Sequence, residues 1–255
     1  MNFCISAVTD AGIKKTINQD CLFVKKYQTA IGNIVFAVLC DGMGGLQRGE
    51  EASAAVVEAF RLWAEKQLLQ IAETSIEDCD IRRQWTEIIA EQNKKLYAYG
   101  ETEGISIGST VVALLLTEER YYALNIGDSR IYEIGLEVKQ ITSDHTVIAE
   151  EVRRGNMTPQ QAEEAPMKNV LTRCIGAGSV VYPDMFFGSP RKNCVYVLCS
   201  DGFRHLISEA EMQTVLLLQN EPNIYRMENC ARDLVECNKR RGETDNISVI
   251  TIFAT

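Results

Sequence analysis

The chain has 255 residues, 46% hydrophobic and 24% charged, a composition typical of a folded globular protein and not of a disordered one. The formal net charge of −9 argues against a general nucleic-acid binder, because such proteins usually present a basic surface. No apolar run approaches the roughly 18 residues that a membrane-spanning helix needs, so no span is predicted.

The nine cysteines raise the question of a metal site or of disulfides. They include no C-x-x-C pair, and the only histidines are His145 and His205, so a zinc site is not expected. The odd number of cysteines, and the start MNFCISAVTD without an apolar leader, favour a reducing, cytoplasmic location.

The first half of the chain predicts strands followed by helices. Short runs rich in β-branched and aromatic residues predict strands over 3–10, 21–27 and 33–40. Apolar residues at helical spacing then predict a helix after Gly49, over 50–73, and a second one over about 80–98.

Strands dominate the second half, over about 108–116, 121–126, 130–134, 137–141, 181–187, 194–199 and 247–253. The charged stretch 144–165 predicts short helices, and two longer helices are expected over 208–219 and 224–239. This order is not the βαβα alternation of a parallel sheet. It predicts an α+β fold in which antiparallel sheets pack together with helix pairs on the outer faces. No Pro/Gly-rich linker divides the chain, so one domain over 1–255 is expected.

Five aspartates stand beside predicted strands: Asp20, Asp41, Asp128, Asp201 and Asp245. Strands of a packed sheet end at a common rim, where carboxylates from distant parts of the chain meet and repel each other unless a cation lies among them. Oxygen ligands without a nitrogen or sulfur cluster favour Mg²⁺ or Mn²⁺. Each aspartate taken alone is more often a turn or cap residue, so the prediction rests on the set.

The segment DGMGG at 41–45 predicts that the chain leaves its strand at Asp41 and enters a glycine turn. A side chain at Gly42 would obstruct the approach of backbone, and the Gly42 carbonyl is available to a cation that Asp41 also binds. The Asp-Gly step at 201–202 is expected to repeat this geometry.

A series of motifs resembles the PPM/PP2C protein phosphatases, most closely the compact bacterial ones. The motifs follow the family's order and spacing along essentially the whole chain: KKTINQD (14–20), VLCDGMGG (38–45), GEEAS (49–53), IGST (107–110), NIGDSRIY (125–132), TSDHT (142–146), LTRCIG (171–176), VLCSDGF (197–203) and TDNISVI (244–250). The resemblance implies a four-layer αββα sandwich of two antiparallel β-sheets flanked by helix pairs.

The same resemblance implies two Mn²⁺ or Mg²⁺ ions and a third, weaker ion. Asp41 would bridge the first two ions, with the Gly42 carbonyl on one of them, while Asp201 and Asp245 would hold the other. Asp128 would form the third site together with Asp201. The remaining residues that would support the ligands are Gln19, Asp20 and Asn246.

The implied activity is hydrolysis of phosphoserine and phosphothreonine on proteins by a metal-activated water, without a covalent intermediate. The implied partners are phosphorylated proteins and a cognate Ser/Thr kinase, with no nucleic acid and no membrane. Lys15 would bind the substrate phosphate where the family usually has Arg, and it lacks the bidentate fork. Gln19 replaces a family Glu, and Met43 stands where some members have a histidine, which leaves the leaving-group acid unassigned.

The segment at about 144–170 would be the flap near the active site. Its arginines and lysine, Arg153, Arg154 and Lys168, are candidates for contact with a phosphoprotein, although a solvated face is the more common role of such residues. His145 is a candidate for the third ion's surroundings, against a loop role, and Arg173 is expected to be structural.

Two other functions are compatible with parts of the sequence. The first is a catalytically weakened binding module, a pseudophosphatase, marked by Lys15 and Gln19. The second is a serine hydrolase with Ser129 as nucleophile, which would need a late His and Asp partner. The late part of the chain offers only His205, without an Asp-x-x-His motif.

Overall fold

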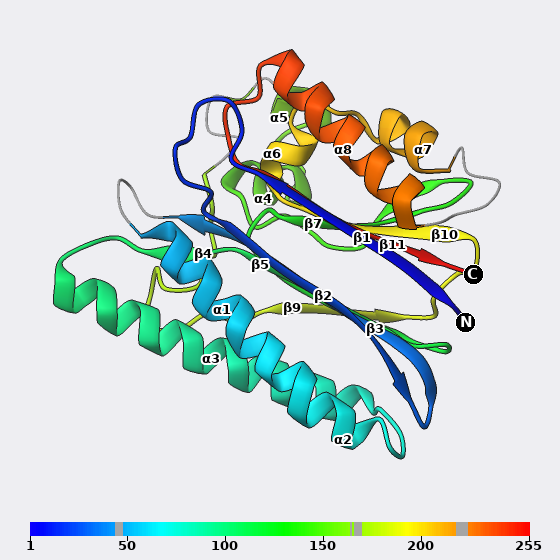
Figure 1. Ribbon diagram of the computed structural model, residues 1–255. Helices are drawn as coiled ribbons and strands as arrows, with labels where there is room; N and C mark the ends of the chain where they lie inside the picture. Colours follow the sequence, from blue (N-terminus) through cyan, green and yellow to red (C-terminus); the bar gives the residue numbers. More distant parts are fainter. Residues whose placement is uncertain (44–47, 164, 166–169, 218–223) are drawn as a thin grey trace.

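The computed structural model describes residues 1–43, 48–163, 165, 170–217 and 224–255, and its strands form two antiparallel sheets (Figure 1). One sheet has the order β1 (Phe3–Asp10), β11 (Ile247–Ala254), β10 (Cys194–Cys199), β7 (Arg130–Ile134) and β8 (Val138–Gln140). The other has the order β2 (Asp20–Thr29), β3 (Gly32–Met43), β5 (Val111–Leu116), β6 (Tyr121–Ile126) and β9 (Asp184–Gly188), and the short β4 (Gly108–Ser109) pairs with the end of β3.

Helices cover the outer face of each sheet. Along β3 and β5 run α1 (Gly49–Trp63), which continues through a π-helical turn (Ala64–Leu68) into α2 (Leu69–Ile71), and α3 (Asp78–Glu103). The other sheet is covered by α6 (Asp201–Arg204), α7 (Glu209–Leu217) and α8 (Ile224–Arg241). The predicted α+β class and its four αββα layers are confirmed (Figure 1).

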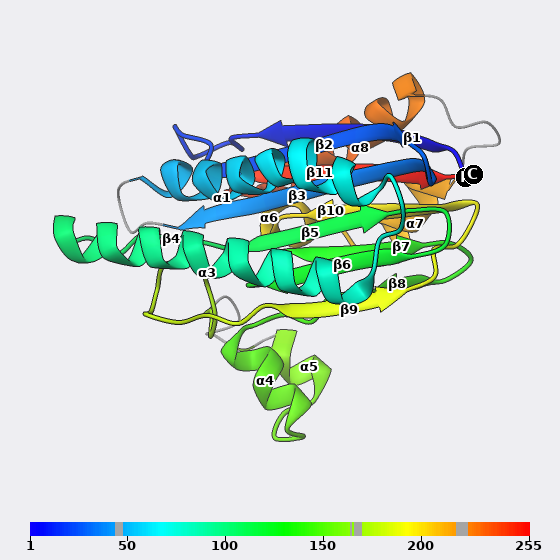
Figure 2. The same cartoon turned by 90° about the horizontal axis from the view of Figure 1, so that it is seen from below.

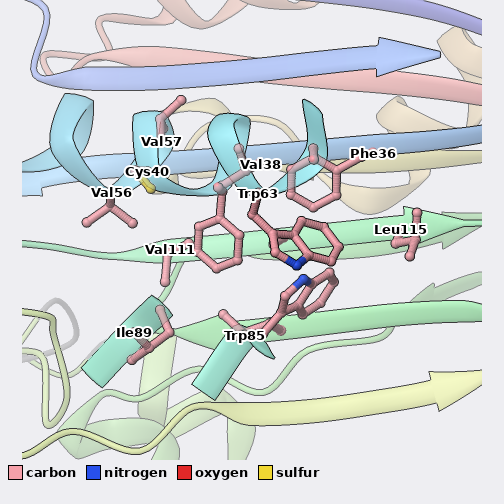
Figure 3. Close-up of a cluster of buried hydrophobic side chains, with 14 of the residues drawn as sticks. Phe36, Val38, Cys40, Val56, Val57, Trp63, Trp85, Ile89, Val111 and Leu115 are labelled. Atoms are coloured by element: carbon pink, nitrogen blue, oxygen red, sulfur yellow. The ribbon is translucent and has the colours of Figure 1, made fainter. Parts of the chain in front are cut away.

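The sequence of β3 is a continuous apolar run because both faces of this strand are buried. Successive side chains of a strand point to opposite faces, so every position then needs an apolar residue. Phe36 and its alternate neighbours pack under the helices, where its ring centroid lies 5.3 Å from that of Trp63. Trp63 in turn lies 5.6 Å from Trp85 of α3 (Figure 3). Val35, Ala37 and Leu39 point the other way, into the core between the two sheets.

Strand β10 divides its side chains in the same manner. Tyr196 and Leu198 lie between the sheets, while Val195 and Val197 pack under α7 and α8. The sandwich therefore has three apolar layers, and β3 and β10, which are interior strands of their sheets, are each buried on both sides.

The flap predicted at about 144–170 contains α4 (Val147–Arg153) and α5 (Pro159–Glu163), which project from the body below β9 (Figure 2). The hydroxyl of Thr146 caps α4 by accepting the Ala149 N–H at 3.1 Å. The base of the flap is closed by the Val147 N–H, which donates to the Val170 carbonyl at 2.9 Å.

Most predicted elements are present with small shifts of their ends. Two predictions were wrong: the strand expected to end at residue 40 continues to Met43, and α6 has no counterpart among the predicted helices. The helix predicted over 208–219 is α7 up to Leu217, and its last two residues lie outside the described ones. None of the described helices is long and apolar enough to span a membrane. The single-domain organisation stays a prediction.

Candidate active site

The six-stranded sheet brings two of the predicted carboxylates directly opposite each other. Asp20 opens β2 and pairs with Asp41 of β3 in the antiparallel register. The ladder does not stop there, because Gly42 and Met43 pair with Ser109 and Gly108 of β4. Asp41 therefore lies inside a strand and not at the start of a glycine turn, and its backbone is fixed on both sides.

Two glycines allow chain segments to approach closely beside these carboxylates. A Cβ at Gly42 would overlap the carbonyl oxygen of Gly49, and a Cβ at Gly202 would overlap that of Asn246. The predicted close approach at Gly42 is thus present. The expected repeat of its geometry was wrong, because Gly42 is in a strand and Gly202 is in helix α6.

The five-stranded sheet supplies the next two carboxylates. Asp201 is the first residue of α6, separated from the end of β10 by Ser200, and Asp245 stands two residues before β11, the neighbouring strand. Asn246 connects this region to the other sheet, because its Oδ1 accepts the Gln19 N–H at 2.9 Å. Its Nδ2 also donates to the carbonyl of Ile17 at 3.2 Å. The rim is therefore shared by both sheets, and not by the strands of one sheet as the sequence alone suggested.

The charges of these residues act on one another. Burial raises the pKa of Asp41 well above its ordinary value, and the neighbouring Asp20, Asp201, Asp128 and Asp245 raise it further. Burial likewise raises the pKa of Asp20 to about 7, an effect that nearby serine hydroxyls oppose and that Asp201 and Asp245 strengthen. Repulsion of this kind acts over short distances, so the five predicted carboxylates lie near one another.

The donor set at this rim fits a hard divalent cation. Both carboxylate oxygens of Asp20 and Oδ1 of Asp201 are buried without a hydrogen-bond partner, and such unpartnered acceptors are unfavourable unless a cation or water satisfies them. Within the described ranges, no group of three or more His, Cys, Asp or Glu side chains is already arranged around one point as a cation site. Such cations commonly complete their coordination with backbone oxygens and water.

Asp128 follows β6 and is buried, and the structure reveals a partner for it that the sequence did not indicate. Arg204 Nη2 lies 3.0 Å from its backbone oxygen and 3.4 Å from its Oδ2. Burial and Asp201 raise the pKa of Asp128 to about 6, while Arg204 opposes the shift. Arg204 therefore competes with any cation for this carboxylate.

Lys15 lies at the exposed side of the cluster. Its Nζ is 3.2 Å from Oδ1 of Asp245, and both side chains are about two-fifths exposed. The side chain of Gln19 packs against Gly49, where a Cβ would lie 2.5 Å from its Nε2. A cationic group thus stands beside the carboxylates, where it can meet an incoming anion.

Comparison with known proteins decides the family. The model described as Protein phosphatase 2C matches residues 11–233. The chain belongs to the protein phosphatase 2C family. Protein phosphatase PhpP of Streptococcus pneumoniae is 32% identical over 251 residues, which cover 97% of this chain and 96% of PhpP.

Solved structures agree with this assignment. The S. agalactiae serine/threonine phosphatase superposes with a TM-score of 0.84 and 30% identity, over the full length of both chains. The catalytic domain of the phosphatase PstP, whose structure is described as a complex with two manganese ions, has a TM-score of 0.76 and 26% identity. It covers 98% of this chain and 97% of its own.

In this 2C-type chain, His145 and Arg173 both contact Asp184, a residue that the sequence analysis did not single out. His145 is almost fully buried, and its Nδ1 accepts the Gly127 N–H at 3.1 Å. Its Nε2 lies 3.0 Å from Asp184, which Arg173 also contacts at 2.8 Å. This cluster ties the turn before Asp128 to β9 and to the base of the flap.

A cleft of about 840 Å³ separates the flap from the body of this phosphatase, and its lining includes Arg130, Asp144, Arg153, Arg204 and His205. Of the predicted flap cations, Arg153 donates to the backbone oxygen of Asp144 at 3.2 Å. Arg154 pairs with two flap glutamates, and Lys168 lies outside the described residues. Arg204 and His205 also contact Asp128 and Asp201, so the cleft adjoins the carboxylate rim.

Ser129 does not fit the serine hydrolase alternative. Its side chain is fully buried, and its Oγ lies 2.9 Å from the hydroxyl of Thr110. Thr110 in turn accepts the N–H of Asp41 at 3.0 Å. Ser129 thus supports the strand that carries Asp41, and a substrate has no path to its hydroxyl.

Proposed function

We propose that this chain, a serine/threonine protein phosphatase of the 2C type, holds two divalent cations between Asp41, Asp201 and Asp245 and uses them to hydrolyse phosphoserine and phosphothreonine. The observation that carries this proposal is the gathering of carboxylates from both sheets at one rim, with buried oxygens that lack a partner. Such an arrangement is unfavourable for a protein without ions and is suited to one that binds them.

The remaining predicted residues take supporting roles in this proposal. The Gly42 carbonyl would complete one site, and Asp128 would hold a third, weaker ion in competition with Arg204. Asn246 fixes the loop that carries Gln19. Asp20 adds negative charge from the opposite strand.

When bound, Mn²⁺ or Mg²⁺ lowers the pKa of a coordinated water and offsets the negative charge of the phosphoryl group. The protein's own part is to hold the carboxylates rigidly and to orient the phosphate. Lys15 attracts the phosphate as a point charge, whereas an arginine would also orient it through two parallel hydrogen bonds. We therefore expect productive but less precise phosphate binding.

The substrates would be phosphorylated proteins, because the cleft between flap and body has room for a peptide segment beside the rim. We propose that a cognate Ser/Thr kinase supplies these phosphoproteins. We also propose a cytoplasmic location, which the nine free cysteines support.

The direct experiment is hydrolysis of a phosphothreonine peptide with added Mn²⁺, and again with excess EDTA. Activity with Mn²⁺ that EDTA abolishes is the expected result, and full activity in EDTA would refute the cation roles. The pseudophosphatase alternative predicts instead that calorimetry detects no bound Mn²⁺ pair. The relatives named as phosphatases give that alternative no support, and the chain keeps all five aspartates that the cations would use.

A further inference from the structure

Two of the proposed cation ligands stand on separate pieces of chain. Asp201 begins α6, while Asp245 lies in the loop between α8 and β11. Asp201 and Asp245 can bind the same ion only if these two segments keep a fixed position relative to each other. A fixed position requires contacts that join the two segments.

Glu243 organises the loop that carries Asp245. Its side chain is buried, and its Oε1 accepts the backbone N–H of Thr244 at 2.7 Å and that of Asp245 at 2.9 Å. Glu243 therefore holds the backbone of two consecutive residues, Thr244 and Asp245, with a single carboxylate oxygen.

His205 connects Glu243 to the other piece of chain. Its Nδ1 lies 3.3 Å from Oε2 of Glu243, the carboxylate oxygen that does not accept the backbone N–H groups, and its Nε2 lies 3.4 Å from Oδ2 of Asp201. His205 directly follows α6, and its imidazole ring lies between the two acidic residues, within ion-pair distance of each. The link from one ligand to the other therefore runs from Asp201 through His205 and Glu243 to the backbone of Asp245.

Helix α8 anchors both pieces from behind. The carbonyl of Asn238 accepts the Glu243 N–H at 3.1 Å, and its side chain donates to the carbonyl of Phe203 at 2.7 Å. Asn238 is fully buried and fixes the backbone at Glu243 and at Phe203. Glu243 and His205 lie closer to the two aspartates, because His205 contacts Asp201 and Glu243 accepts the Asp245 N–H.

We propose that Glu243 and His205 are positioning residues that hold Asp201 and Asp245 in place for a shared divalent cation. The inference rests on the proposed function, because it takes these two aspartates as cation ligands. Residues that orient metal ligands typically change metal affinity or activity by about 10–100-fold when they are replaced. Neither residue needs to touch the substrate, so its loss should act on cation binding first.

Calorimetric titration of Mn²⁺ into the full chain, without substrate, measures this effect. The variants are Glu243→Ala, Glu243→Gln and His205→Ala, and the matched control is Glu133→Ala. Glu133 is also a buried glutamate with two partners, accepting the Tyr196 hydroxyl at 2.7 Å and contacting Arg191 at 3.2 Å. Thermal unfolding in EDTA reports on the fold of each variant.

The expected result is a loss of about tenfold or more in the affinity for one Mn²⁺ in Glu243→Ala and His205→Ala. Glu243→Gln should lose less, because its amide oxygen still accepts both backbone N–H groups. The two alanine changes together should weaken binding by less than the product of their separate effects, since both break one link. Glu133→Ala should keep wild-type affinity even where its unfolding temperature falls.

Wild-type Mn²⁺ affinity in Glu243→Ala would overturn the inference, and so would an equal loss in Glu133→Ala. If Glu243→Ala does not fold, His205→Ala decides, and wild-type Mn²⁺ affinity in that variant would overturn the inference. A wild-type chain that binds no Mn²⁺ would overturn the proposed function and the inference together. Normal binding by the wild type and by all variants overturns the inference alone.

Discussion

Replacing Asp20 by asparagine should stabilise the cation-free protein at alkaline pH. Its pKa is about 7 in the folded chain, against an ordinary value of 3.8. A carboxyl with a raised folded pKa favours the folded state below about pH 4, and this contribution is lost as pH rises towards 7. A shift from 3.8 to about 7 corresponds to roughly 4 kcal/mol. Asp20→Asn removes this penalty, with 4 kcal/mol as an upper limit because a buried amide also loses hydration.

The assay is thermal unfolding in EDTA at several pH values. One kcal/mol shifts the unfolding temperature by about 2–4 °C in a chain of this size, so Asp20→Asn should unfold up to about 8–16 °C higher at pH 8. The difference should shrink as the pH falls below 7 and become small at about 4, because the carboxyl is then protonated in the folded chain and about half protonated in the unfolded one. Added Mn²⁺ should stabilise the wild type more than the variant, since Asp20 adds negative charge to the site.

Asp144→Asn is the matched control, because this aspartate is paired. It accepts from Arg130 at 2.7 Å and lies 3.7 Å from Arg204. Its replacement leaves a largely buried arginine without its partner and should lower the unfolding temperature at every pH. If Asp20→Asn unfolded no later than the wild type at pH 8, or showed the same difference at pH 5, a buried negative charge at Asp20 could not be what destabilises the cation-free protein.

Four further outcomes are expected. Asp41→Asn should lose orders of magnitude in turnover while its unfolding temperature in EDTA does not fall, and wild-type turnover would remove this residue from the site. Lys15→Arg should lower KM for a phosphopeptide by about fivefold, since one more charge-assisted hydrogen bond is worth about 1 kcal/mol, and an unchanged KM would show that Lys15 does not face the phosphate. Gly42→Ala should destabilise the protein by about 1–3 kcal/mol or more in urea unfolding, because its Cβ would overlap backbone, and a neutral effect would contradict that packing. The apparent Mn²⁺ affinity should rise between about pH 6 and pH 8, because Asp128 and Asp20, with pKa values of about 6 and 7, must release protons, and calorimetry in two buffers would show no proton release if this is incorrect.

Regular elements were predictable where one local pattern decides them. Strand β10 was predicted with its bounds intact because its six residues are all apolar and buried, and the two faces fill two different cores. The five aspartates were predictable as a set because each stands beside a predicted strand, although Asp41 lies inside β3 in the structure.

Features that depend on distant partners were not predictable. Local propensity ends β3 before Asp41, since Asp and Gly are poor strand residues, but pairing with Asp20 and with β4 carries the strand onward. The pairing of Arg204 with Asp128 depends on how α6 docks beside the turn after β6. No periodicity in the sequence encodes such a contact.

The sharing of the carboxylate rim between two sheets has a mechanical consequence. A pair of bound cations would cross-link the two sheets of the sandwich at one end. Sliding of one half against the other would pull the ligands apart before any strand lost its ladder. Loss of catalytic competence should therefore precede loss of β-structure when the chain is gently denatured.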